Sequence, residues 1–331
     1  MLSMTDAPPR SAIARFDRSF GQRFLLTVDT EEEFDWDAPL TRDRHGVTHV
    51  ERIATFQEFC ENEGVVPVYL VDWPIAQSSR AADILRGPLA AGKAEIGVQL
   101  HPWVSPPFDE EVTPRNSFAG NLPRELEEAK FRNLRDAIED NFQVAPAIYR
   151  AGRYGIGANS AAMLVEGGIA IDTSVRANFD YSGENGPDFR NHPLFPYWVD
   201  EAKTLLELPL TTVFWGLLRR QGRSIYPALA EMPALRSLLS RGGLLERIPL
   251  TPEGVTVEEA IRGIDIALDD GLPLLVLSFH SPSLAAGQTP YVRDEGDVDA
   301  FYDWWRRVFA YLEQRHVAPT TVAEIMRAVV R

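Results

Sequence analysis

Short apolar runs that each end in one polar residue constrain the fold of this chain more than any other feature. The residues at the ends of these runs are Asp29, His101, Arg150, Asp172 and His280. Continuous apolar runs of a few residues are typical of strands that are buried on both faces. Parallel strands present their carboxyl ends at one edge of a sheet or barrel, where ligands bind. The pattern therefore predicts a parallel sheet with a polar site at its carboxyl edge.

Strand-like and helix-like segments alternate along most of the 331 residues. Strands are predicted at 24–29, 65–71, 95–100, 147–150, 169–172, 205–209 and 274–279, and helices at 50–63, 76–91, 123–142, 157–167, 256–270 and 297–315. About seven or eight βα units favour an α/β barrel. We expect an N-terminal extension at 1–22, a single domain over 23–331, and an irregular insertion at about 175–252, where the alternation breaks down.

Composition restricts the class of partner. The formal net charge of −15 argues against a nucleic acid or an anionic membrane surface, since both need a positive protein surface. The sequence has no signal-peptide pattern and no long apolar segment, so we expect a cytoplasmic protein without a membrane span. Cys60 is the only cysteine, and the apolar spacing around it predicts a buried helical position. The sequence does not indicate an oligomeric state.

The residues at the strand ends predict metal-assisted or acid–base hydrolysis. Asp29 is expected as a general base or metal ligand, because a carboxylate at a buried strand end is costly unless it is paired or faces a site. The alternative is an acid that caps the next turn. Glu31 projects to the same side if the chain stays extended. Arg150 needs a carboxylate partner, for which Asp29 and Asp172 are both candidates, and Asp172 could equally cap a turn.

Histidines supply the remaining candidates. His280 lies between a hydrophobic strand and a turn, where an imidazole suits a general acid or base. His101 and Gln99 alternate onto one strand face, which favours a ligand role for His101 over a structural one. Three further histidines lie in predicted loops, from which they would either contact substrate or have no role in the site: His45, His49 and His192.

In order and position, these residues resemble the five motifs of the polysaccharide deacetylases of carbohydrate esterase family four, the NodB-homology proteins. The matching segments are Thr27-Val-Asp-Thr-Glu31, Glu95-Ile-Gly-Val-Gln-Leu-His101, Arg150-Ala-Gly-Arg-Tyr154, Asp172-Thr-Ser174 and Leu277-Ser-Phe-His280. The resemblance covers about residues 23–330 and implies a distorted (β/α) barrel of about seven units. Within the family, the WalW-like subgroup is the most similar.

The resemblance also implies a role for each residue. Asp29 would be the base, Arg150 would hold its carboxylate, and His280 would be the general acid. Asp172 would orient His280. A divalent metal, expected to be zinc, would be held by Glu31 and His101, with Gln99 where the common second motif has a histidine.

A sugar substrate would pack against aromatic side chains, expected at Trp36, Trp73, Trp103, Tyr154 and Trp215. The sequence thus predicts a metal-dependent hydrolase that removes acetyl groups from a carbohydrate. The bond cleaved would be a carbon–nitrogen bond other than a peptide bond, or an ester bond. Two alternatives stay open. One is an amidohydrolase that acts on a small cyclic amide. The other is a carbohydrate-binding protein without turnover, which Gln99 favours because an amide is a weak ligand.

Overall fold

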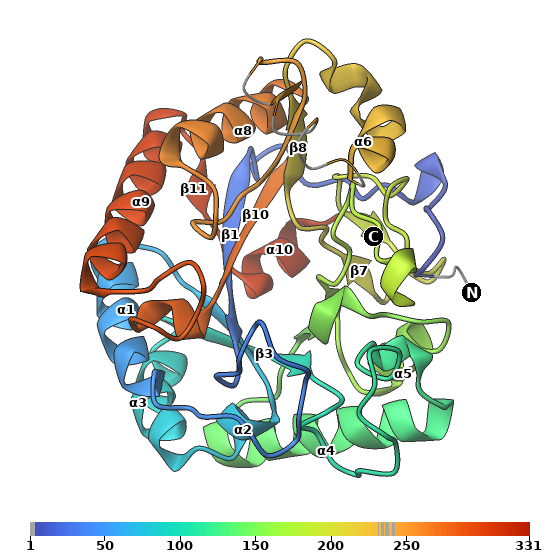
Figure 1. Ribbon diagram of the computed structural model, residues 1–331, viewed down its shortest axis with the longest axis vertical. Helices are drawn as coiled ribbons and strands as arrows, with labels where there is room; N and C mark the ends of the chain where they lie inside the picture. Colours follow the sequence, from blue (N-terminus) through green and yellow to red (C-terminus); the bar gives the residue numbers. More distant parts are fainter. Residues whose placement is uncertain (1–3, 231, 233–234, 236–237, 240–241) are drawn as a thin grey trace.

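A curled, mainly parallel sheet lies at the centre of the molecule (Figure 1). The computed structural model describes residues 4–230, 232, 235, 238–239 and 242–331. The strand order is β10-β1-β2-β3-β4-β5-β7-β6, and β11 pairs with the start of β1. Among the described strands of this sheet, β6 alone is antiparallel to its neighbour, β7. The strands are β1 Arg23–Thr30, β2 Val68–Val71, β3 Glu95–Leu100, β4 Ile148–Ala151, β5 Ile171–Asp172, β6 Tyr197–Trp198, β7 Leu206–Glu207, β10 Leu274–His280 and β11 Ala318–Pro319.

The sheet confirms the predicted α/β class and the distorted, incomplete barrel. Among the described residues no strand pairing joins β10 to β6, so the sheet curls without closing. Most predicted strands differ from the observed ones by a few residues at their ends, and the strand predicted at 95–100 has the observed bounds.

Alternate residues of each strand face opposite sides of the sheet, as a pleated strand requires. Outward-facing side chains such as Leu26 and Val28 belong to the core beneath the helices. Inward-facing ones such as Leu25 and Val276 belong to a second, smaller core. This inner core also holds Ile325 of α10 (Val322–Ala328), so α10 fills the amino-terminal end of the curled sheet.

The inward positions become polar toward the carboxyl ends of the strands. In β1, Leu25 is followed on the same face by Thr27 and Asp29, and in β10, Val276 is followed by Ser278 and His280. The inner space is therefore apolar at one end and polar at the other, which places the site at the carboxyl edge.

Helices cover the outer face of the sheet, where Figure 1 shows α9, α1, α3 and α4 following its curve. The helices are α1 Val50–Asn62, α2 Trp73–Ala76, α3 Ser79–Ala90, α4 Arg124–Phe142, α5 Ser160–Glu166, α6 Gly222–Ala230, α8 Val257–Asp269 and α9 Glu295–Gln314. The helix predicted at 76–91 is observed as α3, which begins three residues later and ends one residue earlier. A short separate helix, α2, precedes it, because the side chains of Asp72 and Ser78 cap two different helices. Cys60 is buried in α1, as predicted.

The segment predicted as an insertion contains a hairpin of β8 (Thr212–Trp215) and β9 (Glu246–Pro249). The hairpin lies beside β10, since the amide of Ser278 donates to the carbonyl of Leu250. In the N-terminal segment, Ile13 and Phe16 form isolated bridges with Tyr197 and Val329. The domain limits drawn from the sequence stay a prediction. No helix in the described part of the chain is long and apolar enough to span a membrane.

Candidate active site

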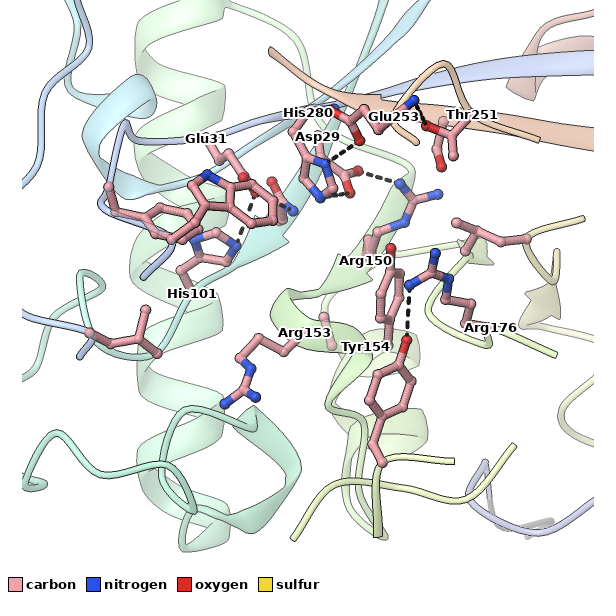
Figure 2. Close-up of a pocket in the computed structure, with 18 of the residues that line it drawn as sticks. Asp29, Glu31, His101, Arg150, Arg153, Tyr154, Arg176, Thr251, Glu253 and His280 are labelled. Atoms are coloured by element: carbon pink, nitrogen blue, oxygen red, sulfur yellow. Dashed lines mark hydrogen bonds and ion pairs between the residues drawn. The ribbon is translucent and has the colours of Figure 1, made fainter. Parts of the chain in front are cut away.

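A cavity of about 640 Å³ opens at the carboxyl edge of the sheet. Most of the residues predicted for the site line it: Asp29, Glu31, Trp36, Gln99, His101, Trp103, Arg150, Tyr154 and His280. Figure 2 shows their polar groups converging from β1, β3, β4 and β10. The sheet register explains this, because Asp29 lies opposite His280 and Gln99 opposite Arg150 in paired strands.

Asp29 is buried and forms an ion pair with Arg150. The Arg150 guanidinium is fixed by two other partners, the hydroxyl of Thr27 at 3.0 Å and the carbonyl of Thr173 at 3.0 Å. A buried guanidinium that is fixed in this way balances the charge of the carboxylate and orients it. Of the two partners considered for Arg150, the structure places Asp29 in contact.

His280 faces Asp29, with 3.7 Å between Nε2 and the carboxylate. Its Nδ1 lies 2.7 Å from Oε2 of Glu253, and its backbone amide donates to the same carboxylate at 3.1 Å. Ser283 donates to Glu253 at 2.6 Å. Burial lowers the pKa of His280, but Glu253, Glu31 and Asp29 outweigh it and raise the pKa to about 10. The imidazole is therefore a cation at neutral pH.

Asp172 does not have the predicted contact with His280. Its carboxylate accepts from the hydroxyl and the amide of Ser174, at 2.7 and 3.1 Å, and it does not line the cavity. Burial, and then the neighbouring Asp172 carboxylate, raise the pKa of Glu207. The reason is topological: β5 lies four strand pairings away from β1 and five away from β10, whereas Glu253 follows the hairpin that lies beside β10.

Glu31, Gln99 and His101 form a second group on the cavity wall. Gln99 donates to Glu31 at 3.1 Å, and Nε2 of His101 lies 3.5 Å from the same carboxylate oxygen. The other oxygen of Glu31 and the amide oxygen of Gln99 are buried and have no hydrogen-bond partner among the described residues. Burial raises the pKa of Glu31 to about 8, although His280 and His101 lower it. Oxygen atoms of this kind fit a cation that would replace the missing partners.

A second acidic cluster lies behind this group. Glu32, Asp72 and His101 offer ligand atoms within 4.8 Å of one another. However, Glu32 already accepts from Nδ1 of His101 and from Nε1 of Trp103, both at 2.7 Å, and Asp72 caps α2. Neither acid lines the cavity. This cluster is therefore better suited to orienting His101, with Nε2 directed to Glu31, than to holding an ion that meets a substrate.

Glu33 does not line the cavity either. Its carboxylate accepts from Nδ1 of His49 at 2.9 Å, and Nε2 of His49 lies 2.7 Å from the hydroxyl of Ser281. That hydroxyl accepts from the amide of Glu31 at 3.3 Å. His49 thus supports the backbone that carries Glu31. Neither His45 nor His192 lines the cavity.

The five predicted aromatic residues divide into two groups. Trp36, Trp103 and Tyr154 line the cavity, and Trp36 lies edge-on to the ring of His280 with 5.2 Å between centroids. Trp73 and Trp215 do not line it. Trp73 is the first residue of α2, which turns away from the sheet, and Trp215 packs against Arg262 at the far end of β8.

Glu253 is the residue of this site that the sequence analysis missed. It follows the short run Ile248-Pro-Leu250, so an acid after an apolar run was again the available signal. That run lies in the segment predicted as irregular, 175–252, which hid the signal. The partner of His280 comes from the short connection between this segment and the helix predicted at 256–270.

The fold was compared with known proteins. No protein-family model matches the sequence. No curated protein matches it. Solved structures do match, at low identity. A probable polysaccharide deacetylase from Pseudomonas aeruginosa PAO1 has a TM-score of 0.50 and 13% identity over 96% of this chain and 92% of that one.

Two further structures are similar. The Puue allantoinase has a TM-score of 0.52 and 13% identity, over 97% of this chain and 93% of that one. A 4-alpha-glucanotransferase from Thermococcus litoralis has a TM-score of 0.54 and 13% identity, over 93% of this chain and 40% of that one. The chain therefore shares its fold with polysaccharide deacetylases of the NodB type.

Proposed function

We propose that this chain is a metal-dependent hydrolase that removes acetyl groups from a carbohydrate. The observation that carries the proposal is the pairing of Asp29 and His280 across β1 and β10, each held by its own counter-ion. Arg150 orients the Asp29 carboxylate as the base, and Glu253 keeps His280 protonated as an acid. Hydrolysis of an amide or ester needs both states at once, one on each side of the reacting carbon.

The proton transfers follow from this arrangement. Asp29 takes a proton from a water molecule that attacks the acetyl carbonyl, while Arg150 holds the carboxylate in place. Since Nδ1 of His280 faces Glu253, its Nε2–H is directed to the reacting groups. His280 gives this proton to the departing sugar nitrogen or oxygen, the C–N or C–O bond breaks, and acetate remains. This assigns the base role to Asp29 and the acid role to His280, with Glu253 as the positioning residue.

Glu31, His101 and Gln99 would hold the metal, since Gln99 and His101 both contact the Glu31 carboxylate at the cavity wall, and one oxygen each of Glu31 and Gln99 has no hydrogen-bond partner among the described residues. When bound, a divalent ion such as zinc supplies Lewis-acid activation of a carbonyl and of water. The carboxylate of Glu32 assists by fixing the ring of His101.

The carbohydrate substrate is inferred from the wall of the cavity, where Trp36, Trp103 and Tyr154 offer faces for a sugar ring. The motif order within residues 23–330 supports a place in carbohydrate esterase family four and, at the finer level, in its WalW-like subgroup. The cytoplasmic location stays a prediction.

Acetate release tests the proposal. The purified protein is incubated with zinc and a panel of N- and O-acetylated sugars, with allantoin as a cyclic amide. Release of acetate from a sugar, abolished by EDTA and by Asp29→Asn, is the expected result. Opening of the cyclic amide without acetate release would replace the proposal by the amidohydrolase alternative.

Gln99 favours a second candidate, a carbohydrate-binding protein without turnover. An amide oxygen is an uncharged and weak ligand for a transition ion, which usually takes at least three imidazole, thiolate or carboxylate ligands. Titration calorimetry with zinc distinguishes the two candidates. If Gln99 is a ligand, Gln99→His should tighten zinc binding by about tenfold or more. Unchanged binding would place the ion elsewhere.

A further inference from the structure

The cavity wall contains one arginine whose charge is not balanced. Arg150 is paired with Asp29, and Arg153 with Glu184. Arg176 also lines the cavity, yet within the described part of the chain it forms no ion pair with a carboxylate. The chain contains 48 acidic residues and only 33 basic ones, so this is not a shortage of acids.

Neutral aromatic groups hold the Arg176 side chain. Its guanidinium carbon lies 3.9 Å from the ring centroid of Phe179 and 5.1 Å from that of Tyr154. One terminal nitrogen donates to the hydroxyl of Tyr181 at 3.2 Å, and Nε is buried without a hydrogen-bond partner among the described residues. Stacking on rings is weaker than an ion pair and does not replace a counter-ion. It does fix the plane of the guanidinium, in which Nε has no hydrogen-bond partner among the described residues.

We propose that Arg176 binds a singly charged oxyanion on the substrate, which makes the substrate an acidic, acetylated carbohydrate; this rests on the proposed function. A partly buried cation without a partner is costly in the free protein, and an incoming anion would remove that cost. The planar guanidinium matches an oxyanion with two parallel hydrogen bonds. Since Arg176 carries a single positive charge, a substrate group with a single negative charge would balance it.

The position of Arg176 suits a substrate that spans the cavity. The guanidinium of Arg176 lies over the ring of Tyr154, and both side chains line the same cavity as Asp29 and His280. Figure 2 shows Arg176 beside Tyr154, on the same side of the cavity as Arg150. The anion would therefore lie across Tyr154 from the acid–base pair, on a different part of the sugar from the acetyl group.

A second unpartnered group lies in the neighbouring segment. The hydroxyl of Thr212 is buried, lines the cavity and has no hydrogen-bond partner among the described residues. The segments of Arg176 and Thr212 are joined, since the side chain of Asn178 donates to the carbonyl of Thr212 at 2.7 Å. A hydroxyl donor near a guanidinium is a common combination in oxyanion sites.

Two sources would supply such an anion, the carboxylate of a uronic acid and the phosphodiester of a linked sugar. Binding is measured by calorimetry with methyl glucuronoside, with its neutral methyl ester, and with a methyl phosphodiester of glucose. None of these carries an acetyl group, so the result does not depend on deacetylation, and failure of the proposed activity would be a separate finding.

The wild-type protein should bind at least one of the two anions about tenfold or more tightly than the neutral ester. The anion that binds more tightly identifies the substrate group, either the carboxylate of a uronic acid or the phosphodiester of a linked sugar. Arg176→Gln should abolish this preference, and Arg176→Lys should keep part of it. Arg223→Gln is the matched control, because Arg223 also donates only to neutral groups, on Asn178 and His192, but does not line the cavity. Equal binding of acid and ester by the wild type, or a preference that survives Arg176→Gln, would overturn the proposal.

Discussion

Asp29 and His280 illustrate how one residue acquires its function from a partner on another strand. A lone aspartate at a strand end would be a costly buried charge, and the Arg150 guanidinium stabilises it in the ionised state. Asp29→Asn keeps the shape of the side chain and removes its basicity. We expect acetate release to fall by about 10² or more, and the melting temperature to fall as well, because the buried Arg150 guanidinium loses its counter-ion. Comparable turnover by a folded variant would rule out Asp29 as the base.

Glu253 should control the pH range in which His280 acts. Glu253 is the strongest of the groups that raise the pKa of His280 to about 10. A raised pKa keeps the imidazole protonated below that pH, so activity that needs the acid form should be lost only on the alkaline side. Glu253→Gln removes the largest raising cause, and the alkaline limb of the kcat/KM profile should move to lower pH. Glu253→Asp should restore part of the shift. If the alkaline limb of both variants stayed at the pH of the wild type, the positioning role of Glu253 would be contradicted.

At the scale of elements, the strand ends were predictable and the connections were not. Buried strands are recognisable as apolar runs, and their carboxyl ends meet at one edge, so the positions of Asp29, His101, Arg150 and His280 followed from the pattern. The partners of these residues come from elsewhere. Glu253 follows a hairpin strand, and Glu32 reaches His101 only because the chain turns after β1. Side-chain direction after a strand depends on local backbone turns, which periodicity does not describe.

The connection between β3 and α4 depends on one buried lysine. Lys130 of α4 is fully buried, and its Nζ donates to the carbonyls of Pro102, Ser105 and Pro107 at 3.0, 2.6 and 2.7 Å. It also pairs with Glu110 at 3.0 Å. Lys130 therefore orders the connection that carries Trp103 into the cavity.

We expect Lys130→Met to lower the free energy of unfolding by about 3 kcal/mol or more, because it leaves three carbonyls without their donor and removes one of the two cations that face Glu110. Urea denaturation measures this loss, and hydrogen exchange should show faster exchange over 102–110. Lys93→Met is the control, because the Lys93–Glu61 pair is largely exposed, and its effect should stay within about 0.5 kcal/mol. Equal stability of the two variants would show that the connection does not depend on Lys130.

The whole molecule is strongly acidic, and several of its carboxyl groups are buried away from the cavity. Glu127 of α4 is one of these. It accepts from the hydroxyl of Ser160 at 2.6 Å, which ties α4 to α5. Burial raises the pKa of Glu127 to about 7, although the Ser160 hydrogen bond lowers it. The folded protein thus holds a proton there that the unfolded chain has already released, which links global stability to pH.

The sign of this linkage can be predicted. Between the ordinary glutamate pKa of 4.5 and about 7, the folded state binds more protons than the unfolded state at Glu127. The contribution of Glu127 to the free energy of unfolding therefore falls as pH rises through this window, by at most about 1.4 kcal/mol per pH unit. Glu127→Gln cannot lose a proton, so it should gain stability relative to the wild type between pH 5 and pH 8, by about 3 kcal/mol in total. Urea denaturation at both pH values measures the difference. Glu125 is exposed on the same helix. The free energy of unfolding of Glu125→Gln should therefore depend on pH as that of the wild type does. A stability difference for Glu127→Gln that stays constant with pH would show that Glu127 is ionised in the folded protein throughout this range.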